Sequence, residues 1–311
     1  MERPLIIGSR GSKLALWQAE HIQKQLQTID PHRSIEIKII KTSGDIKTDP
    51  LSVIGGKGVF TKELEEALIA KRIDIAVHSL KDLPTILPEQ LTIAAICERE
   101  DARDALVLRT PLDINSLSQL PSGMVVGTSS QRRLAQLKAQ RKDVVVKDLR
   151  GNVDTRIKKL DEGQYDALIL ASAGLRRLGL HDRISCAIPT AEMLPAVGQG
   201  AIAIETRADD EFAASTIGKL DHSSTRIACL AERSLLRSLG GGCQFPIAAH
   251  ASFSLDRTQL HLEALVAMPD GSRVVRNSAT AAATEAEELG QQLAVQMRRA
   301  GADEILSEFL S

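Results

Sequence analysis

The residue best suited to covalent chemistry is Cys243, which follows three consecutive glycines and precedes Gln244, Phe245 and Pro246. Consecutive glycines are typical of a backbone with positive φ or of an approach too close for a β-carbon. A thiol on such a turn could react with a ligand in a cleft. The alternative is a buried, inert cysteine behind a helix that ends in glycine, because most free cysteines are of that kind and no base adjoins this one. The local sequence leaves both interpretations open.

A second group of reactive side chains lies at residues 78–82, where the sequence is His-Ser-Leu-Lys-Asp. It follows a strand predicted over Ile73–Val77. In an open α/β sheet, residues just past the carboxyl end of a strand usually line the ligand crevice. Asp82 is the carboxylate we single out, because Pro84 stiffens its loop. The structural alternative is a network of turn hydrogen bonds with no ligand.

Basic residues recur where predicted strands give way to helices. Arg10 follows a strand over Leu5–Gly8, and Ser12 begins a helix, an arrangement that either binds an anion or only caps the helix. Similar junctions follow strands ending at Gly127, Val146 and Ala171, and they carry Thr128, Ser129, Arg132, Arg133, Arg150, Arg156, Arg176 and Arg177. Arginine pairs with carboxylates or phosphates and never loses its charge. So many at one sheet edge predict a small polyanionic ligand.

The alternation of strands and helices predicts an α/β fold of two doubly wound lobes around a cleft, followed by a small α+β domain. We expect residues 1–98 with 199–218 to form the first domain, 103–194 the second and 222–311 the third. The apolar segment Ala201–Ile204 is expected to return the chain to the first lobe. Further elements are helices over Thr61–Arg72, from Ser223, over Glu285–Arg299 and over Asp303–Phe309, and a hairpin around Pro269-Asp270-Gly271.

Composition excludes several classes of protein. The 311 residues carry a net charge of −1, with 39 basic and 40 acidic side chains, so no bulk field attracts nucleic acid or a membrane. Aromatic residues make up only 2% of the chain, which disfavours RNA binding by base stacking. No apolar run is long enough to cross a membrane, and Met1–Ile7 lacks the apolar core of a signal peptide. The four cysteines show no metal-ligand spacing, so we expect no metal. Nothing points to secretion, so we expect a cytoplasmic location. We expect a monomer because the chain has several domains and no evident coiled coil.

The segment Lys41–Gly58 is polar and ends in Gly-Gly-Lys-Gly. Its spacing is not that of a nucleotide-binding P-loop. Either it is a mobile loop that carries Lys57 over a site, or it is an ordinary surface excursion.

Taken together, these segments resemble the porphobilinogen deaminase (hydroxymethylbilane synthase) family over nearly the whole chain. The resemblance rests on seven motifs in order, which begin at Gly8, Gly56, His78, Gly127, Leu149, Pro195 and Gly241. It implies a fold of three domains, the first two similar to type II periplasmic binding proteins. This chain departs from relatives at Val53, where some carry a loop lysine, and at Gly240, where the residue is often larger.

The resemblance also implies a function and a set of site residues. Cys243 would hold a dipyrromethane cofactor through a thioether, and four porphobilinogen molecules would be added head to tail with loss of ammonia. Asp82 matches the catalytic carboxylate. Cofactor-binding positions are matched by Ser12, Ser79, Lys81, Asp82, Thr128, Ser129, Arg132, Arg133 and Arg150. Substrate-binding positions are matched by Arg10, Arg132, Arg150, Arg156, Arg177, Lys57, Phe60 and Gln199, whereas Arg176 matches less well than Arg177.

Two other classes are weighed against this enzyme. A two-lobed protein that binds a carboxylated ligand without chemistry would explain the arginines, but not Asp82 among cations or the domain with Cys243. An RNA-binding protein would use the same arginines, but the aromatic content and near-zero net charge disfavour it.

Overall fold

The computed structural model describes residues 3–43, 60–242 and 244–310. The chain separates into two compact units, of which unit 1 is Met1–Glu100 with Ala201–Arg226 and unit 2 is Asp101–Gly200 with Ile227–Ser311. The boundaries of the three predicted domains stay predictions. Lys57 and Cys243 lie outside the described residues.

Unit 1 contains a five-stranded sheet in the order β2-β1-β3-β10-β4. Its strands are β1 (Leu5–Ser9), β2 (Ile35–Ile39), β3 (Ile75–Ser79), β4 (Leu91–Ile96) and β10 (Ile202–Arg207). Strand β1 runs parallel to β2 and β3, and β10 runs antiparallel to β3 and β4. The predicted return of the chain to the first sheet after residue 200 is therefore confirmed.

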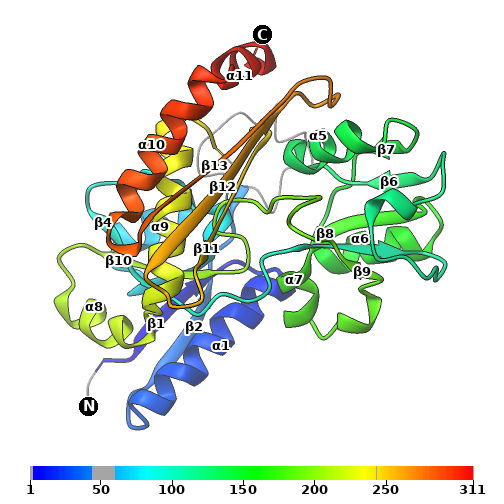
Figure 1. Ribbon diagram of the computed structural model, residues 1–311. Coiled ribbons are helices and arrows are strands. Elements are labelled where there is room, and N and C mark those ends of the chain that lie inside the picture. The colour runs from blue at the N-terminus through cyan, green and yellow to red at the C-terminus, as the bar shows by residue number, and fades with distance from the viewer. Residues whose placement is uncertain (1–2, 44–59, 243, 311) are drawn as a thin grey trace. The chain divides into compact units, whose positions relative to one another are not determined.

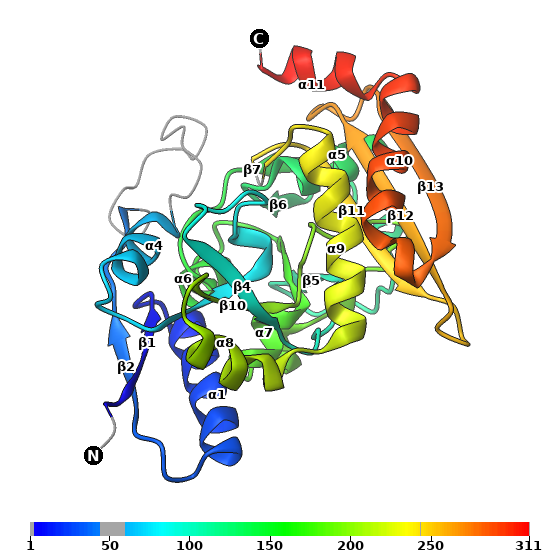
Figure 2. The same cartoon turned by 90° about the vertical axis from the view of Figure 1, so that its left-hand side faces the viewer.

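Helices cover both faces of this sheet. One face holds α1 (Lys13–Ile29), which lies beside β1 and β2 in Figure 2, and α8 (Glu211–Ile217). The other face holds α4 (Lys62–Ile69), and the short helices η1 (Leu80–Asp82) and η4 (Gly218–Leu220) follow β3 and α8. Helix α1 turns Ala15, Ala19, Ile22 and Leu26 inward, at the spacing of one helical face.

Unit 2 contains a second five-stranded sheet in the order β7-β6-β8-β5-β9. Its strands are β5 (Asp104–Leu108), β6 (Val125–Gly127), β7 (Val145–Lys147), β8 (Ala167–Ala171) and β9 (Cys186–Ala187). Helix α5 (Gln131–Gln140) covers one face, and α6 (Val153–Asp161) and α7 (Ser172–Arg177) cover the other. The short helices are η2 (Leu117–Gln119) and η3 (His181–Arg183). With β5 in the place of β10, the strand pattern matches that of unit 1.

The C-terminal part of unit 2 is a three-stranded antiparallel sheet with helices against it (Figure 1). Its strands are β11 (Ile247–Phe253), β12 (Gln259–Ala267) and β13 (Val274–Ala282), and its helices are α9 (Ser223–Ser238), η5 (Ala283–Glu285), α10 (Ala286–Arg299) and α11 (Ala302–Leu310). Helices α9 and α10 pack so closely that a β-carbon at Gly290 would lie 2.4 Å from the carbonyl oxygen of Ala231. The chain thus has two α/β sheets and a separate α+β part, as predicted.

The C-terminal sheet also packs on α5. Ala135 of α5 shares a small apolar cluster with Leu194, Ala248, Leu265 and Ala267. In the β12–β13 turn, Gly271 has φ 72°, and a β-carbon there would lie 2.5 Å from the carbonyl carbon of Lys138. Glycine is needed at Gly271 for both reasons.

Three details differ from the expectations. Helix α4 ends at Ile69 and not at Arg72, because Lys71 adopts φ 56° and the N–H of Arg72 donates to the carbonyl of Ala67. This is the hydrogen-bond pattern of a Schellman C-cap, usually signalled by glycine. Strands β5, β9 and β11 are not predicted at all. The sequence also predicts Thr61 as the cap of helix α4, but its hydroxyl makes no capping hydrogen bond.

Candidate active site

The carboxyl ends of β1 and β3 lie next to each other in unit 1, because the two strands are parallel neighbours. Arg10 follows β1, and its guanidinium carbon lies 4.2 Å from the ring centroid of Phe60. Ser12 caps α1, since its hydroxyl oxygen accepts a hydrogen bond of 3.3 Å from the N–H of Ala15. The predicted capping role of Ser12 is confirmed, and ligand binding there stays a prediction.

Beyond β3, the short helix η1 carries Lys81 and Asp82 in partly exposed positions. Ser79 is fixed from α1, because the side-chain amide of Gln18 donates a hydrogen bond of 2.9 Å to its hydroxyl oxygen. Within the described ranges, the Asp82 carboxylate has no hydrogen bond or ion pair to another side chain. Its position therefore leaves the carboxylate available to a ligand at this edge.

The corresponding edge of unit 2 contains a buried ion cluster of Asp104, Arg132 and Arg133. Asp104 is 0% exposed, and the two arginines are 4% and 5% exposed. Arg132 donates to Asp104 Oδ2 at 2.7 Å, and Arg133 donates to Asp104 Oδ1 at 2.8 Å. Arg132 also donates to the carbonyl of Leu194, and Arg133 to that of Ile169. These two guanidinium groups thus pair with a carboxylate of the protein itself.

The electrostatics of this cluster favour the ionised state of Asp104. Burial alone would raise the pKa of Asp104, but the charges of Arg132 and Arg133 and their hydrogen bonds hold it well below its ordinary value. One carboxylate between two guanidinium groups leaves one net positive charge. The cluster can attract an anion while its hydrogen-bonding groups are occupied.

The other predicted residues of unit 2 are more exposed, except Thr128. Thr128 is buried, and its hydroxyl oxygen accepts from the N–H of Ser130 at 3.2 Å, whereas Ser129 is partly exposed. The remaining arginines are partly exposed or exposed. Arg150 pairs with Asp148 at 3.1 Å, Arg156 donates to the carbonyl of Gly151 at 2.7 Å, Arg177 donates to that of Gly200 at 2.6 Å, and Arg176 lies 3.7 Å from Asp101.

Two residues that the sequence analysis misses organise this edge. Asp104 accepts a hydrogen bond of 3.0 Å from the side chain of Gln199, which also donates to the carbonyl of Ala102. Glu232 of α9 is buried and accepts from the N–H of Gly198 at 2.7 Å and from that of Ala251 at 2.9 Å. Neither residue has a clear sequence signal, because Asp104 follows Arg103 at the start of its apolar run and Glu232 lies beside Arg233.

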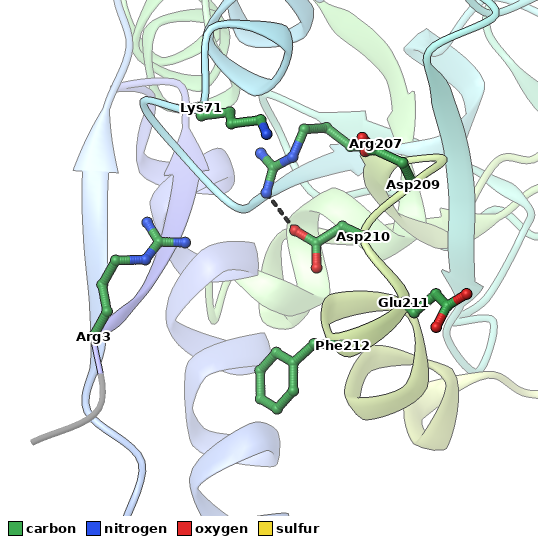
Figure 3. A pocket seen from close by; sticks show the side chains of 7 residues that line it. All are labelled: Arg3, Lys71, Arg207, Asp209, Asp210, Glu211 and Phe212. Carbon is green, nitrogen blue, oxygen red and sulfur yellow. Dashed lines mark hydrogen bonds and ion pairs between the residues drawn. The ribbon is translucent and has the colours of Figure 1, made fainter.

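A hollow of about 380 Å³ lies at the other edge of the unit 1 sheet, shown in Figure 3. It is lined by Arg3, Lys71, Arg207, Asp209, Asp210, Glu211 and Phe212. Arg207 pairs there with Asp210 and Asp74, and Arg3 pairs with Asp74. Since Arg3 precedes β1 and Arg10 follows it, this hollow is distinct from the edge that carries Asp82.

The described residues contain neither a metal-ligand cluster nor a membrane-spanning helix. In residues 3–43, 60–242 and 244–310, no group of His, Cys, Asp and Glu is placed to hold a metal ion. Across the same ranges, every helix is too short or too polar to span a bilayer.

The fold and these sheet edges define an α/β protein with cationic side chains beyond its strand ends. A family model described as "Porphobilinogen deaminase, dipyromethane cofactor binding domain" matches residues 5–215, and one described as "Porphobilinogen deaminase, C-terminal domain" matches residues 226–299. The chain belongs to the porphobilinogen deaminase family.

The chain is also similar to individual relatives and solved structures. The chain is 50% identical over 313 residues to the porphobilinogen deaminase of Chlorobium phaeovibrioides, and 51% identical over 308 residues to that of Chromobacterium violaceum, covering 99% of this chain and 98% of each relative. Among solved structures, an ancestral arginine-binding protein bound to arginine is 17% identical, with a TM-score of 0.39 over 71% of this chain and 91% of that one. A substrate-binding domain of a putative amino acid transporter from Streptococcus pneumoniae is 14% identical, with a TM-score of 0.44 over 76% and 95%.

Proposed function

We propose that this chain is the transferase that joins four porphobilinogen molecules head to tail, loses ammonia at each addition and releases linear hydroxymethylbilane by hydrolysis. Support comes from the family models and from relatives named porphobilinogen deaminase, which are similar to this chain over nearly their whole length. The observation that carries the proposal is the position of Asp82. Its carboxylate is partly exposed, and it lies next to Lys81 at the same sheet edge as Arg10.

The proposed cofactor is a dipyrromethane attached through Cys243. Its acetate and propionate groups suit the cationic side chains at the strand ends, so the donor set fits the group. The residues that would hold it are Ser12, Ser79, Lys81, Asp82, Thr128, Ser129, Arg132, Arg133 and Arg150. When bound, the cofactor supplies the pyrrole carbon to which the first substrate is joined.

Asp82 is the proposed catalytic residue. Its carboxylate would accept hydrogen bonds from pyrrole N–H groups and stabilise the azafulvenium cation that the substrate becomes when ammonia leaves. It would also assist proton transfer as each new bond forms, a role that contributes about 10²- to 10⁴-fold to a rate. Gln18 and Ser79 fix the strand end immediately before it.

The substrate carboxylates are assigned to Arg10, Arg150, Arg156, Arg177 and Lys57. Phe60 and Gln199 are assigned to other contacts with the substrate. Arg132 and Arg133 are committed to Asp104, so we propose that they act on bound carboxylates chiefly through the net positive charge of the cluster. Each added pyrrole brings two further carboxylates, which is why several separate cations are needed.

The first test is the intact mass of the purified chain, with Cys243→Ser as control. We expect a mass that exceeds the polypeptide by a two-pyrrole adduct, absent from the control. Asp82→Asn should retain the adduct and lose at least about 100-fold in ammonia release. A bare polypeptide from cells that make porphobilinogen would contradict the proposal and favour an anion-binding protein without chemistry. The cytoplasmic location and monomeric state stay predictions, and sedimentation velocity tests the latter.

A further inference from the structure

The turn that joins β7 to α6 carries Arg150, one of the cations assigned above to cofactor and substrate carboxylates. It comprises residues 148–152 (Figure 1). Leu149 is 0% exposed and anchors the turn in the apolar core beside α6, whereas Arg150 is partly exposed. Gly151 has φ 109°, and a β-carbon there would lie 2.7 Å from Cγ2 of Thr155. The turn is therefore packed tightly against the start of α6.

Three side chains donate hydrogen bonds to backbone carbonyl groups of this turn. The pairs are Tyr165 Oη with the carbonyl of Asp148 at 2.6 Å, Lys159 Nζ with that of Arg150 at 3.1 Å, and Arg156 Nε with that of Gly151 at 2.7 Å. Arg156 and Lys159 are three residues apart and so lie on the same side of α6. Tyr165 comes from the segment after this helix. Helix α6 and the segment beyond it thus fix three carbonyl groups of the turn that precedes the helix.

The hydrogen bond from Lys159 is not needed merely to satisfy a carbonyl group. Arg150 is partly exposed and Gly151 is exposed, so water could reach this part of the turn and donate instead. Holding a lysine side chain in one rotamer is unfavourable in conformational entropy. A fixed lysine is therefore expected where the geometry of the turn matters.

The geometry of this turn determines where the Arg150 guanidinium lies. Arg150 Nε donates to Asp148 Oδ2 at 3.1 Å, and the carbonyl of the same aspartate accepts from Tyr165. Both backbone and side chain of Asp148 therefore connect Arg150 to the fixed part of the turn. A guanidinium binds a carboxylate best through two parallel hydrogen bonds, which require a defined orientation of the fork.

We propose that Lys159 is a positioning residue for Arg150. With Tyr165 and Arg156 on the neighbouring carbonyl groups, it holds the turn so that the guanidinium is oriented before a substrate carboxylate arrives. The proposal rests on the proposed function, which assigns Arg150 to substrate carboxylates. Without the hydrogen bond from Lys159, part of the binding free energy is spent on ordering the turn. Substrate binding should then weaken, while the chemistry assigned to Asp82 in unit 1 should continue.

The test uses the purified full chain with its cofactor, confirmed by mass, and measures kcat and KM for porphobilinogen per loaded molecule. Lys159→Met keeps an unbranched side chain but cannot donate. It should raise KM by about three- to tenfold and change kcat by less than about twofold, as expected for the loss of one hydrogen bond.

Lys158→Met is the matched control. Lys158 is the preceding residue of α6, its side chain is 77% exposed, and it pairs with Glu162 at 3.8 Å. This variant loses the same charge and should leave KM unchanged. An equal rise in KM in both variants would mean that the charge of α6 matters and not the hydrogen bond to the turn, which would overturn the proposal.

Hydrogen exchange gives a readout that is independent of turnover. In the loaded chain without substrate, the amides of residues 148–152 should exchange about three- to tenfold faster in Lys159→Met than in the parent, because one hydrogen bond no longer opposes opening of the turn. Lys158→Met should exchange there as the parent does. Unchanged exchange in Lys159→Met would contradict the proposal.

A double variant tests whether Lys159 acts through Arg150. In an Arg150→Gln background, Lys159→Met should raise KM by less than about a further twofold, because both changes affect the same contact. Multiplying effects, or a normal KM in Lys159→Met alone, would overturn the proposal. If Lys159→Met does not fold, an unchanged KM in Tyr165→Phe, which loses only the hydroxyl on the Asp148 carbonyl, overturns it. A loaded parent chain that releases no ammonia would instead refute the proposed function.

Discussion

Each five-stranded sheet has a carboxylate at the edge where its parallel strands end, but the carboxylate comes from a different element in each sheet. In each sheet an antiparallel strand pairs with the last residue of a parallel strand, Ile202 opposite Ser79 in unit 1 and Asp104 opposite Ala171 in unit 2. In unit 1, β10 begins with Ile202, and the carboxylate is that of Asp82 in η1, the short helix that follows β3. In unit 2, β5 begins with Asp104, and its carboxylate is buried within the sheet edge.

This difference decides what nearby cations can do. Asp104 is fully buried and forms ion pairs with Arg132 and Arg133. Asp82 is partly exposed, and the nearby Arg10 lies over the ring of Phe60. A carboxylate inside the protein is stable only with charged partners, so it withdraws them from direct contact with a ligand. One strand position therefore distinguishes a buried ion cluster in unit 2 from a partly exposed carboxylate, Asp82, in unit 1.

The largest expected effect distinguishes the two aspartates by stability. Asp104→Asn should lower the free energy of unfolding of unit 2 by about 3–5 kcal/mol, because it leaves two buried guanidinium groups without their counterion. Asp82→Asn should change it by less than about 0.5 kcal/mol, as is usual for a substitution away from packed features. Hydrogen exchange, read separately for β1 with β3 and for β5 with β8, measures both. Equal effects would break the comparison.

The next prediction separates the committed arginines from the exposed ones. Arg133→Lys should cost about 1–3 kcal/mol of stability, because one ammonium cannot replace the bonds to Asp104 and Ile169. Arg156→Lys, whose parent side chain donates to the carbonyl of Gly151, should change stability by less than about 0.5 kcal/mol and raise KM. Denaturant titration with steady-state kinetics tests the pair. A stability loss in Arg156→Lys as large as that in Arg133→Lys would contradict the distinction.

The two units should also respond to pH in opposite directions. The pKa of Asp104 is lowered in the fold, so its contribution to stability is present above the ordinary value of 3.8 and is lost as pH falls toward the folded pKa. The pKa of Glu65 is raised, so its contribution is full below the ordinary value of 4.5 and is lost as pH rises through the folded pKa. Hydrogen exchange at several pH values should show acid weakening of β5 with β8 that Asp104→Asn removes. Relative to the parent chain, Glu65→Gln should protect β1 with β3 more at pH 7 than at pH 4.

Local sequence patterns predict most elements here, and they predict little about which charges pair. The spacing of Ala15, Ala19, Ile22 and Leu26 is a local signal, so α1 is predicted well. The strand β5 is a short apolar run without a periodic signal, and its contact with Arg132 spans 28 residues and depends on sheet pairing. The sequence places the arginines at strand ends, but their burial follows from Asp104. The roles of Asp82 and Cys243 come from family resemblance and not from spacing.

The smallest expected effect concerns the cation at the unit 1 edge. Phe60→Leu removes the ring under Arg10 but keeps an apolar side chain, so it should weaken the placement of this guanidinium by about 0.5–1 kcal/mol, which corresponds to about a two- to fivefold rise in KM for porphobilinogen. Phe212→Leu is the matched control, because its ring lies 4.4 Å from the guanidinium of Arg33 beside the hollow at the other edge. That variant should leave KM unchanged. Equal KM values for both variants would mean that Arg10 is positioned without Phe60, and that exposed cations at this edge need no aromatic support.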